Sequence, residues 1–220
     1  MTRESMAPGR RARRWLALAD VIGMPALILL FIWRLQFSEP ASWWIFPAWL
    51  AASFLFQGDT AKTLGWRGDN LGAALREAGI FFSIVFLLLL AMGLGFHGGS
   101  AAAGRELGAR HLWDYFAFCL LQQVALNSFL NNRMIFLLSR RWLSSLATGA
   151  IFAAAHWPNP VLVPVTFVGG TGMAWLFERN RNILPLAAGQ AIAGALLGWS
   201  FPAAWHHNLR VGPGYFHWRE

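Results

Sequence analysis

Long apolar runs constrain this chain more than any other feature of its sequence. Residues 24–32, 80–94 and 183–199, each with its apolar flanks, are long enough to cross the hydrocarbon of a bilayer, which takes about 20 helical residues. The chain is 56% hydrophobic and only 13% charged, whereas a soluble domain carries about 25% charged residues. We therefore predict an all-α fold, a polytopic transmembrane helical bundle in the cell membrane.

Hydropathy places about seven spans in the chain, and a count of eight stays open. We divide the chain into a basic N-terminal segment (1–14), a transmembrane domain (15–205) and a C-terminal tail (206–220). A separate interfacial helix is expected at 70–78, where Asn70 can cap the first turn and apolar residues share one face. The expected spans lie at about 15–35, 41–56, 78–96, 112–130, 142–157, 160–177 and 183–203.

The basic residues predict the orientation of these spans. If the N-terminus is cytoplasmic, 13 of the 18 basic residues lie on the cytoplasmic side, including those of an expected loop at 133–141. Cytoplasmic segments carry the excess of lysine and arginine, so we predict a cytoplasmic N-terminus, with the loop at 98–110 and the C-terminus outside. Because the basic residues lie beside spans and form no single stripe, nucleic acid is not an expected partner.

A row of amide side chains lies within the fourth expected span. Gln123, Asn127 and Asn131 recur every four residues and therefore share one helix face, and Gln122 lies one position round from it. Amides are costly in lipid, so this row faces other helices or a wet cavity. Hydrogen bonding between helices and a polar site both remain open for these residues.

Other polar residues in the spans have simple alternatives to a functional role. His156 ends the fifth span and is either an interfacial residue or a proton-transfer group that faces a polar cavity. Gln190 lies among small residues, where close helix packing with one hydrogen bond is the plain interpretation. The adjacent His206 and His207 do not face the same way, so we predict no metal site and no cofactor. Cys119 is the only cysteine and cannot form a disulfide within the chain.

The order of these residues resembles the CPBP intramembrane proteases, also called the Abi or CAAX-protease family, which includes the Ras-converting endopeptidase. Members show Glu-Glu-x-x-x-Arg, then Phe-x-x-x-His, then His-x-x-x-Asn or Asp. Here Gln-Gln-Val-Ala-Leu-Asn stands at 122–127, Phe-Ala-Ala-Ala-His at 152–156 and Gln-Ala-Ile-Ala-Gly at 190–194. The resemblance covers about residues 60–200 and implies a site within the membrane built by His156, Gln122, Gln123, Asn127 and Gln190.

The departures from the family motifs give two hypotheses for function. The resemblance implies a glutamate that activates water, but a glutamine amide has no proton to exchange near neutral pH and cannot act as a general base. In the first hypothesis the protein is an intramembrane endopeptidase with a degenerate motif, in which His156 is the base and the amides hold water or the oxyanion. In the second it is inactive and binds a hydrophobic or lipid-modified peptide, or an isoprenoid-like lipid, as a chaperone, a regulator or in other lipid chemistry.

Overall fold

The computed structural model describes residues 9–97 and 109–217, and all regular structure within them is helical. The N-terminal helices are α1 (Arg10–Leu30), η2 (Phe31–Leu35), α2 (Gln36–Ser38), η3 (Pro40–Trp44), α3 (Ile45–Gln57), α4 (Ala61–Leu64) and α5 (Leu71–His97). The C-terminal helices are α6 (Ala109–Gln123), η5 (Val124–Asn131), α7 (Asn132–Leu138), α8 (Arg141–Ala154), α9 (Leu162–Asn180), α10 (Leu184–Ser200), α11 (Ala203–His206), η6 (His207–Leu209) and α12 (Pro213–Phe216).

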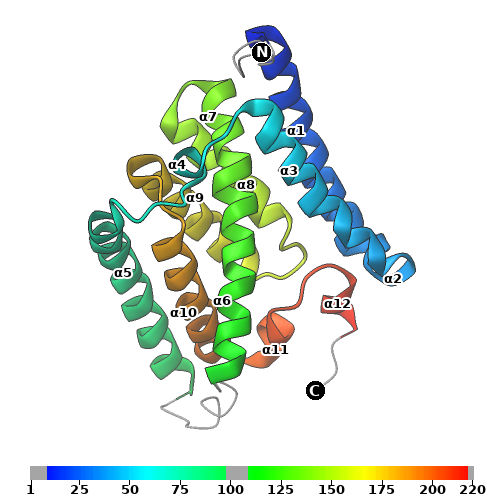
Figure 1. Cartoon of the computed structure of the whole chain (residues 1–220). Helices are drawn as coiled ribbons and strands as arrows, with labels where there is room; N and C mark the ends of the chain where they lie inside the picture. Colours follow the sequence, from blue (N-terminus) through cyan, green and yellow to red (C-terminus); the bar gives the residue numbers. More distant parts are fainter. Residues whose placement is uncertain (1–8, 98–108, 218–220) are drawn as a thin grey trace.

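Each expected span coincides with a long helix, and successive long helices run in alternating directions through the bundle (Figure 1). Two helical stretches among the described residues, Arg10–Ser38 and Leu71–Phe96, are long and apolar enough to cross a membrane. A third is added if Leu184–Ser200 and Ala203–Leu209, which meet at 120°, form one broken span. The fold is therefore an all-α membrane bundle. That the chain crosses the membrane seven times stays a prediction.

Lipid-facing side chains are plain on α5. Ile80, Ile84, Leu87 and Leu88 are 57–67% exposed along this helix, although its opposite face packs on the bundle through Ala78 and Phe82. Exposed aliphatic side chains in such a row would be costly in water, whereas they match the hydrocarbon of a membrane.

Two expectations about segment boundaries are wrong. The expected interfacial helix at 70–78 is the beginning of α5, which continues without a break to His97. The expected loop at 133–141 is helical as far as Leu138, because α6, η5 and α7 follow one another directly. As a result Arg133, which we counted with the loop charges, is 4% exposed inside the bundle. The expected outer loop at 98–110 lies mostly outside the described residues.

Glycines set the closest helix contacts. At Gly149 of α8, an added Cβ would lie 2.7 Å from the backbone oxygen of Phe167 in α9, so these two helices approach backbone to backbone. At Gly189 of α10, it would lie 2.1 Å from the ring of Phe82 in α5. Small residues allow this close approach in membrane bundles, where packing rather than the hydrophobic effect drives association.

The central helix of the bundle contains a π-helical segment, η5. Leu126, Asn127, Ser128, Phe129, Leu130 and Asn131 are all buried, so this segment has protein around its whole circumference. Phe129 lies in the main hydrophobic cluster together with Phe177 and Ile183, and all three are fully buried. A π-helical turn within an α-helix is rare and is frequently found at functional sites.

The C-terminal segment after α10 folds back across the end of the bundle (Figure 1). Asn159 fixes it there, because its fully buried side chain donates to the main-chain oxygens of His206 and Arg210. The Oδ1 atom of the same side chain accepts from the backbone amides of Val161 and Leu162 at the start of α9. One amide thus joins the α8–α9 connection to the C-terminal segment.

Candidate functional site

Six polar side chains from three helices form a continuous chain of hydrogen bonds, which we call the amide relay. Thr148 Oγ1 of α8 donates to Asn131 Oδ1 at 3.3 Å, and Asn131 Nδ2 donates to Asn127 Oδ1 at 3.4 Å. Asn127 Nδ2 donates to Gln123 Oε1 at 2.5 Å, and Gln123 Nε2 donates to Gln190 Oε1 of α10 at 2.6 Å. Gln190 Nε2 then donates to Gln122 Oε1 at 2.6 Å. Every bond in the relay points in the same direction.

The middle of the relay is closed. Gln123, Asn127 and Asn131 are each 0% exposed. Gln123 and Asn131 each make a second donated bond, since Gln123 Nε2 reaches Met173 Sδ at 3.1 Å and Asn131 Nδ2 reaches the Ala174 oxygen at 3.1 Å, both on α9. The relay therefore satisfies its polar groups within the protein, as a group buried in lipid requires.

The local sequence explains this geometry. The four-residue spacing of Gln123, Asn127 and Asn131 suits the wide π-helical turn of η5, which keeps all three on the face toward α9 and α8. Gly189 brings α10 close to α5, and the next residue, Gln190, can then reach between Gln122 and Gln123. Sequence spacing predicts the first of these arrangements, but the partner on α10 follows only from the fold.

The structure joins four of the five candidate residues and leaves His156 outside the hydrogen-bonded relay. His156 lies in the turn after α8, where its ring packs edge-on against Phe152 with centroids 4.6 Å apart. Its Nδ1 donates to the Phe152 oxygen at 2.6 Å, so Nε2 is the ring nitrogen that can accept a proton. The four-residue spacing thus lets the backbone oxygen and the ring of Phe152 orient the imidazole.

The two tail histidines are held by the C-terminal segment itself. His206 is buried, and its Nε2 donates to the Phe201 oxygen at 3.1 Å, while its Nδ1 accepts from the Leu209 amide. The ring of His207 stacks on Tyr215 with centroids 4.0 Å apart. Within residues 9–97 and 109–217, no three side chains among His, Cys, Asp and Glu lie close enough together to hold a metal ion.

A buried ion cluster lies between α1, α3 and α7, and the sequence did not reveal it. Arg133 Nε is 3.1 Å from Asp20 Oδ2, and Arg133 Nη2 is 2.7 Å from Asp59 Oδ2. Ser53 and Trp49 donate to the two oxygens of Asp20 at 2.6 and 2.9 Å. Asp20 stands on α1, Ser53 on α3 and Arg133 on α7, so the cluster joins the first two long helices to the central helix.

Glu178 is a buried acid that no sequence pattern singles out, because it stands only two residues before the end of α9. It is 7% exposed, and its Oε1 accepts from Ser144 and Ser145 of α8 at 2.7 and 3.0 Å. Its Oε2 is buried without a hydrogen-bond partner in the described part of the chain. This carboxylate belongs to the α8–α9 contact and is not bonded to the amide relay.

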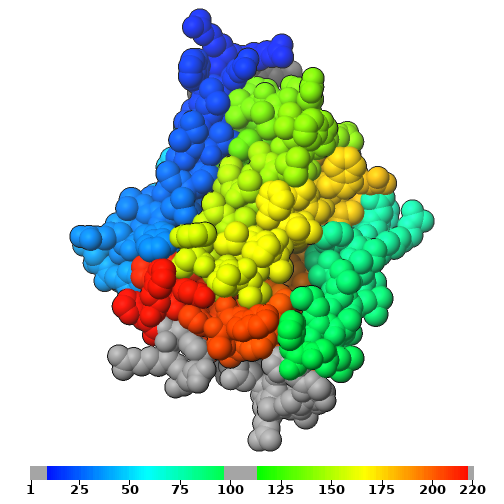
Figure 2. All heavy atoms as spheres, turned by 180° about the vertical axis from the view of Figure 1, so that it is seen from behind, coloured from blue at the N-terminus to red at the C-terminus, as the bar shows by residue number. Residues whose placement is uncertain are grey.

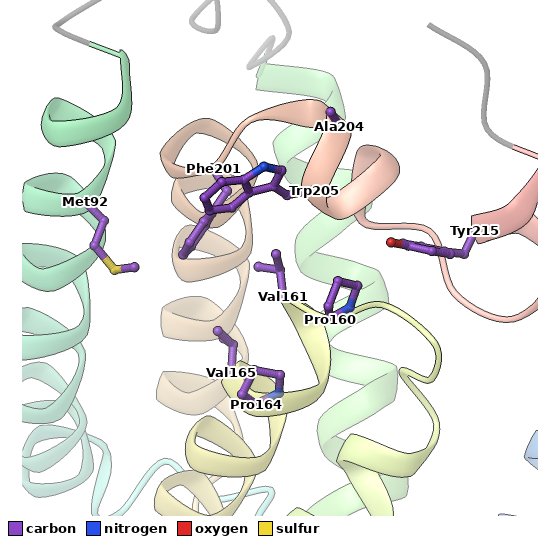
Figure 3. A pocket seen from close by; sticks show the side chains of 9 residues that line it. All are labelled: Met92, Pro160, Val161, Pro164, Val165, Phe201, Ala204, Trp205 and Tyr215. Carbon is purple, nitrogen blue, oxygen red and sulfur yellow. The ribbon is translucent and has the colours of Figure 1, made fainter.

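Two apolar hollows lie at the end of the bundle that holds His156. The larger, of about 640 Å³, lies between Met92 of α5, the start of α9 and the C-terminal residues Phe201, Trp205 and Tyr215 (Figure 3). The smaller, of about 420 Å³, lies between α1 and the end of α8, where Ala153, Ala154 and Trp157 flank His156. None of the relay residues lines either hollow.

The chemistry available to this arrangement is limited by its residue types. The relay contains amides and one hydroxyl, which orient and donate hydrogen bonds but do not accept a proton at neutral pH. Among the candidate residues, the imidazole of His156 is the one group that can accept a proton at neutral pH. Proton transfer and amide donors are therefore placed on different parts of the fold.

Comparison with protein families shows what the chain is similar to. A family model described as type II CAAX prenyl endopeptidase Rce1-like matches residues 30–196, about three quarters of the chain. Neither curated proteins nor solved structures give a match. The matched range includes the relay and His156 and stops just before the C-terminal segment that Asn159 holds.

Proposed function

The chain belongs to the type II CAAX prenyl endopeptidase Rce1-like family, and we propose that it is a member that binds a hydrophobic or lipid-modified peptide without glutamate-dependent cleavage. The observation that carries the proposal is the closed amide relay at the positions of the family's glutamates. Gln123 and Asn127 are fully buried and bonded to protein groups, which favours a structural role for them over water activation.

The smaller hollow supports a binding function. Its volume of about 420 Å³ falls in the range of small-ligand sites, and it is lined by apolar side chains from α1, η2, the end of α8 with the turn after it, and α9. Three of its lining residues, Ala153, Ala154 and Trp157, stand within three positions of His156 in the sequence. An isoprenoid chain or an apolar peptide side chain suits such a lining, because neither carries a polar group that would need a hydrogen-bond partner there.

A His156-dependent hydrolase is the second candidate function. The hydrogen bond from Nδ1 to Phe152 favours it, because this bond fixes the tautomer that leaves Nε2 as an acceptor. In this hypothesis Nε2 accepts a proton from water, and the amides Gln122, Gln123, Asn127 and Gln190 exchange their bonds within the relay for bonds to the oxyanion. General-base catalysis by one group contributes about 10²- to 10⁴-fold in rate, so the two hypotheses differ measurably.

A proteolysis assay separates the candidates. The purified protein in lipid nanodiscs is given prenylated and transmembrane peptides, and wild type is compared with His156→Ala and with Gln122→Glu/Gln123→Glu. Our proposal expects no cleavage by wild type above background. Cleavage that disappears in His156→Ala would replace it with the hydrolase. Cleavage that appears only in the double glutamate variant would show that the missing carboxylates alone silence the protein.

A binding assay tests the positive half of the proposal. We expect a fluorescent farnesylated peptide to bind wild type, and Ala154→Phe to weaken binding about tenfold or more by filling the hollow. Ala150→Phe is the matched control, because Ala150 is exposed on the same helix and lines neither hollow. Equal affinity in the two variants would remove the hollow as the binding site.

The orientation in the membrane is part of the same proposal. We place the N-terminus in the cytoplasm, as the basic residues predict. Removing Arg133 from the loop charges leaves 12 basic residues on the cytoplasmic side against five outside, so the asymmetry persists. Helix α1 begins at one end of the bundle and α12 lies at the other, as an odd number of crossings requires (Figure 1).

A further inference from the structure

The tetrapeptide Arg-Arg-Trp-Leu occurs twice in the chain, at 13–16 and at 140–143. The first copy lies in the opening turns of α1 and the second at the start of α8. Both helices run away from the same end of the bundle, so the two copies stand at that end together (Figure 1).

A cation–π contact fixes the neighbourhood of the two copies. The Arg13 guanidinium lies 5.8 Å from the centroid of the Phe136 ring, and its Nε donates to Gln57 Oε1 at 3.4 Å. Arg13 therefore packs the first turns of α1 against α7, which ends at Leu138, two residues before the second copy. Figure 2 shows the start of α1 beside the 130–145 region at the top of the molecule.

The remaining residues of both copies present one pattern to the outside. Arg14, Arg140 and Arg141 are exposed, and Trp15 and Trp142 are 64% and 52% exposed. None of the ion pairs found among the described residues uses these arginines. Each copy thus combines unpaired positive charge with an indole ring on the adjacent position.

We propose that the two Arg-Arg-Trp-Leu copies form a binding surface for the headgroups of anionic phospholipids. Guanidinium groups bind phosphate oxygens through paired, charge-assisted hydrogen bonds. Indole rings settle at the boundary between headgroups and hydrocarbon, so Trp15 and Trp142 place the arginines at the level of the phosphates.

The surrounding surface favours a lipid over a soluble polyanion. Apolar side chains follow each copy on the same helix, with Ile22 68% exposed on α1 and Leu146 38% exposed on α8. The charge therefore stands at the edge of a lipid-facing surface. Basic residues next to spans attract anionic lipid by about fivefold in affinity each, which corresponds to about 1 kcal/mol.

The test compares lipid retention by charge-matched variants. Protein is reconstituted in mixed phosphatidylcholine and phosphatidylglycerol, extracted in mild detergent, and its bound lipids are counted by native mass spectrometry. Arg14→Gln/Arg141→Gln should lower the preference for phosphatidylglycerol by on the order of 10- to 30-fold. The control Arg34→Gln/Arg210→Gln removes the same charge from exposed residues outside both copies and should keep the preference.

Two further double variants, and the outcomes that would overturn the proposal, complete the test. Trp15→Ala/Trp142→Ala should reduce retention of phosphatidylglycerol although the charge is unchanged. An equal loss in the two arginine variants would show a general charge effect and overturn the proposal. Displacement of the retained lipid by inorganic phosphate would also overturn it, because it would indicate a free-phosphate site. A lysine pair, Arg14→Lys/Arg141→Lys, should restore part of the preference and shows that the surface is still folded.

Discussion

The side-chain amide of Gln123 donates a 2.6 Å hydrogen bond to Oε1 of Gln190, 67 positions later in the chain. These are positions of the first and third family motifs, where the resemblance expects glutamate and histidine. The contact therefore joins two of these positions through amide groups, which do not exchange protons near neutral pH. It also gives the central helix a polar link to α10 in a bundle held mainly by packing.

The amide relay should contribute measurably to stability. Asn127→Ala removes the donor to Gln123 Oε1 and leaves that buried oxygen without its partner, at an expected cost of about 1–3 kcal/mol. Unfolding in mixed detergent measures the free energy. The exposed Glu39→Ala is the control and should change it by less than about 0.5 kcal/mol. An effect of Asn127→Ala no larger than the control would mean that the relay residues are loosely held.

Removing the buried cation should be more severe than removing an exposed one. Arg133→Leu leaves Asp20 and Asp59 without their counter-charge and should cost about 3–5 kcal/mol. Arg179→Leu breaks the pair with Glu77, in which the arginine side chain is 53% exposed, and should cost less than about 1 kcal/mol. Adding Asp20→Asn to Arg133→Leu should recover part of the loss. Similar costs for the two single variants would contradict the burial of the cluster.

The backbone contact between α8 and α9 gives a paired glycine test. Gly149→Ala forces a methyl group to within 2.7 Å of the Phe167 oxygen and should destabilise the protein by about 1–3 kcal/mol. Gly169→Ala in α9 meets nothing within 4 Å, so its higher helix propensity should be neutral or stabilising by up to about 1 kcal/mol. Melting temperatures of the two variants should move in opposite directions or differ by several degrees. A neutral Gly149→Ala would mean that the helices can separate at low cost.

The proposed topology is tested with fusions at both ends. A reporter that is active only in the cytoplasm should be silent after Glu220 and active when joined to the N-terminus. A signal from the C-terminal fusion would require an even number of crossings and remove the seven-span prediction. Arg34→Glu serves as a control for charge effects, because it only strengthens the expected asymmetry and should leave both readings unchanged.

The loop before α5 should lose stabilising interactions in acid. The hydrogen bond from Arg67 holds the pKa of Asp69 at about 2, below its ordinary value of 3.8. Because this pKa is lower in the folded protein than in the unfolded chain, the ionised carboxylate stabilises the folded protein at pH values above about 4. This stabilisation is lost as the pH falls from about 4 toward about 2. Asp69→Asn should flatten that part of the pH profile of the melting temperature. The effect should be small because the pair is exposed, and the exposed Glu39→Gln should leave the profile unchanged.

Sequence patterns located the helices and the polar face of the central helix. The apolar runs predicted every long helix. A segment in lipid must satisfy its backbone hydrogen bonds internally, so each long apolar run is expected to form a helix. The four-residue spacing predicted that Gln123, Asn127 and Asn131 act together. The sequence could not say that their partners are Gln190, Met173 and the Ala174 oxygen, since partners on other helices depend on how the helices pack.

Charged residues were the weaker part of the sequence-based prediction. Arg133 was placed in a loop because a charged residue near the end of an apolar run normally leaves the membrane, yet Asp20 and Asp59 neutralise it inside the bundle. The burial of Glu178 was not predicted, because the polar run that it begins with Arg179 and Arg181 is typical of an exposed helix end. Burial of a charge depends on its counter-charge, and a counter-charge 113 positions away cannot be seen along the chain.

The π-helical segment η5 phases the two polar systems of the central helix. A π-helical turn holds about one residue more than an α-helical turn, and one residue corresponds to roughly 100° of rotation about an α-helix. Deleting one residue between Val124 and Asn131 would let the helix close into regular α turns. Because a π-helical turn and an α-helical turn both complete one full rotation, Arg133 would then keep its direction toward Asp20 and Gln123 its place beside Gln190. Closing the same residues into α turns without a deletion would instead rotate Arg133 by roughly 100° away from Asp20, so the wider turn keeps the ion cluster and the amide relay in register.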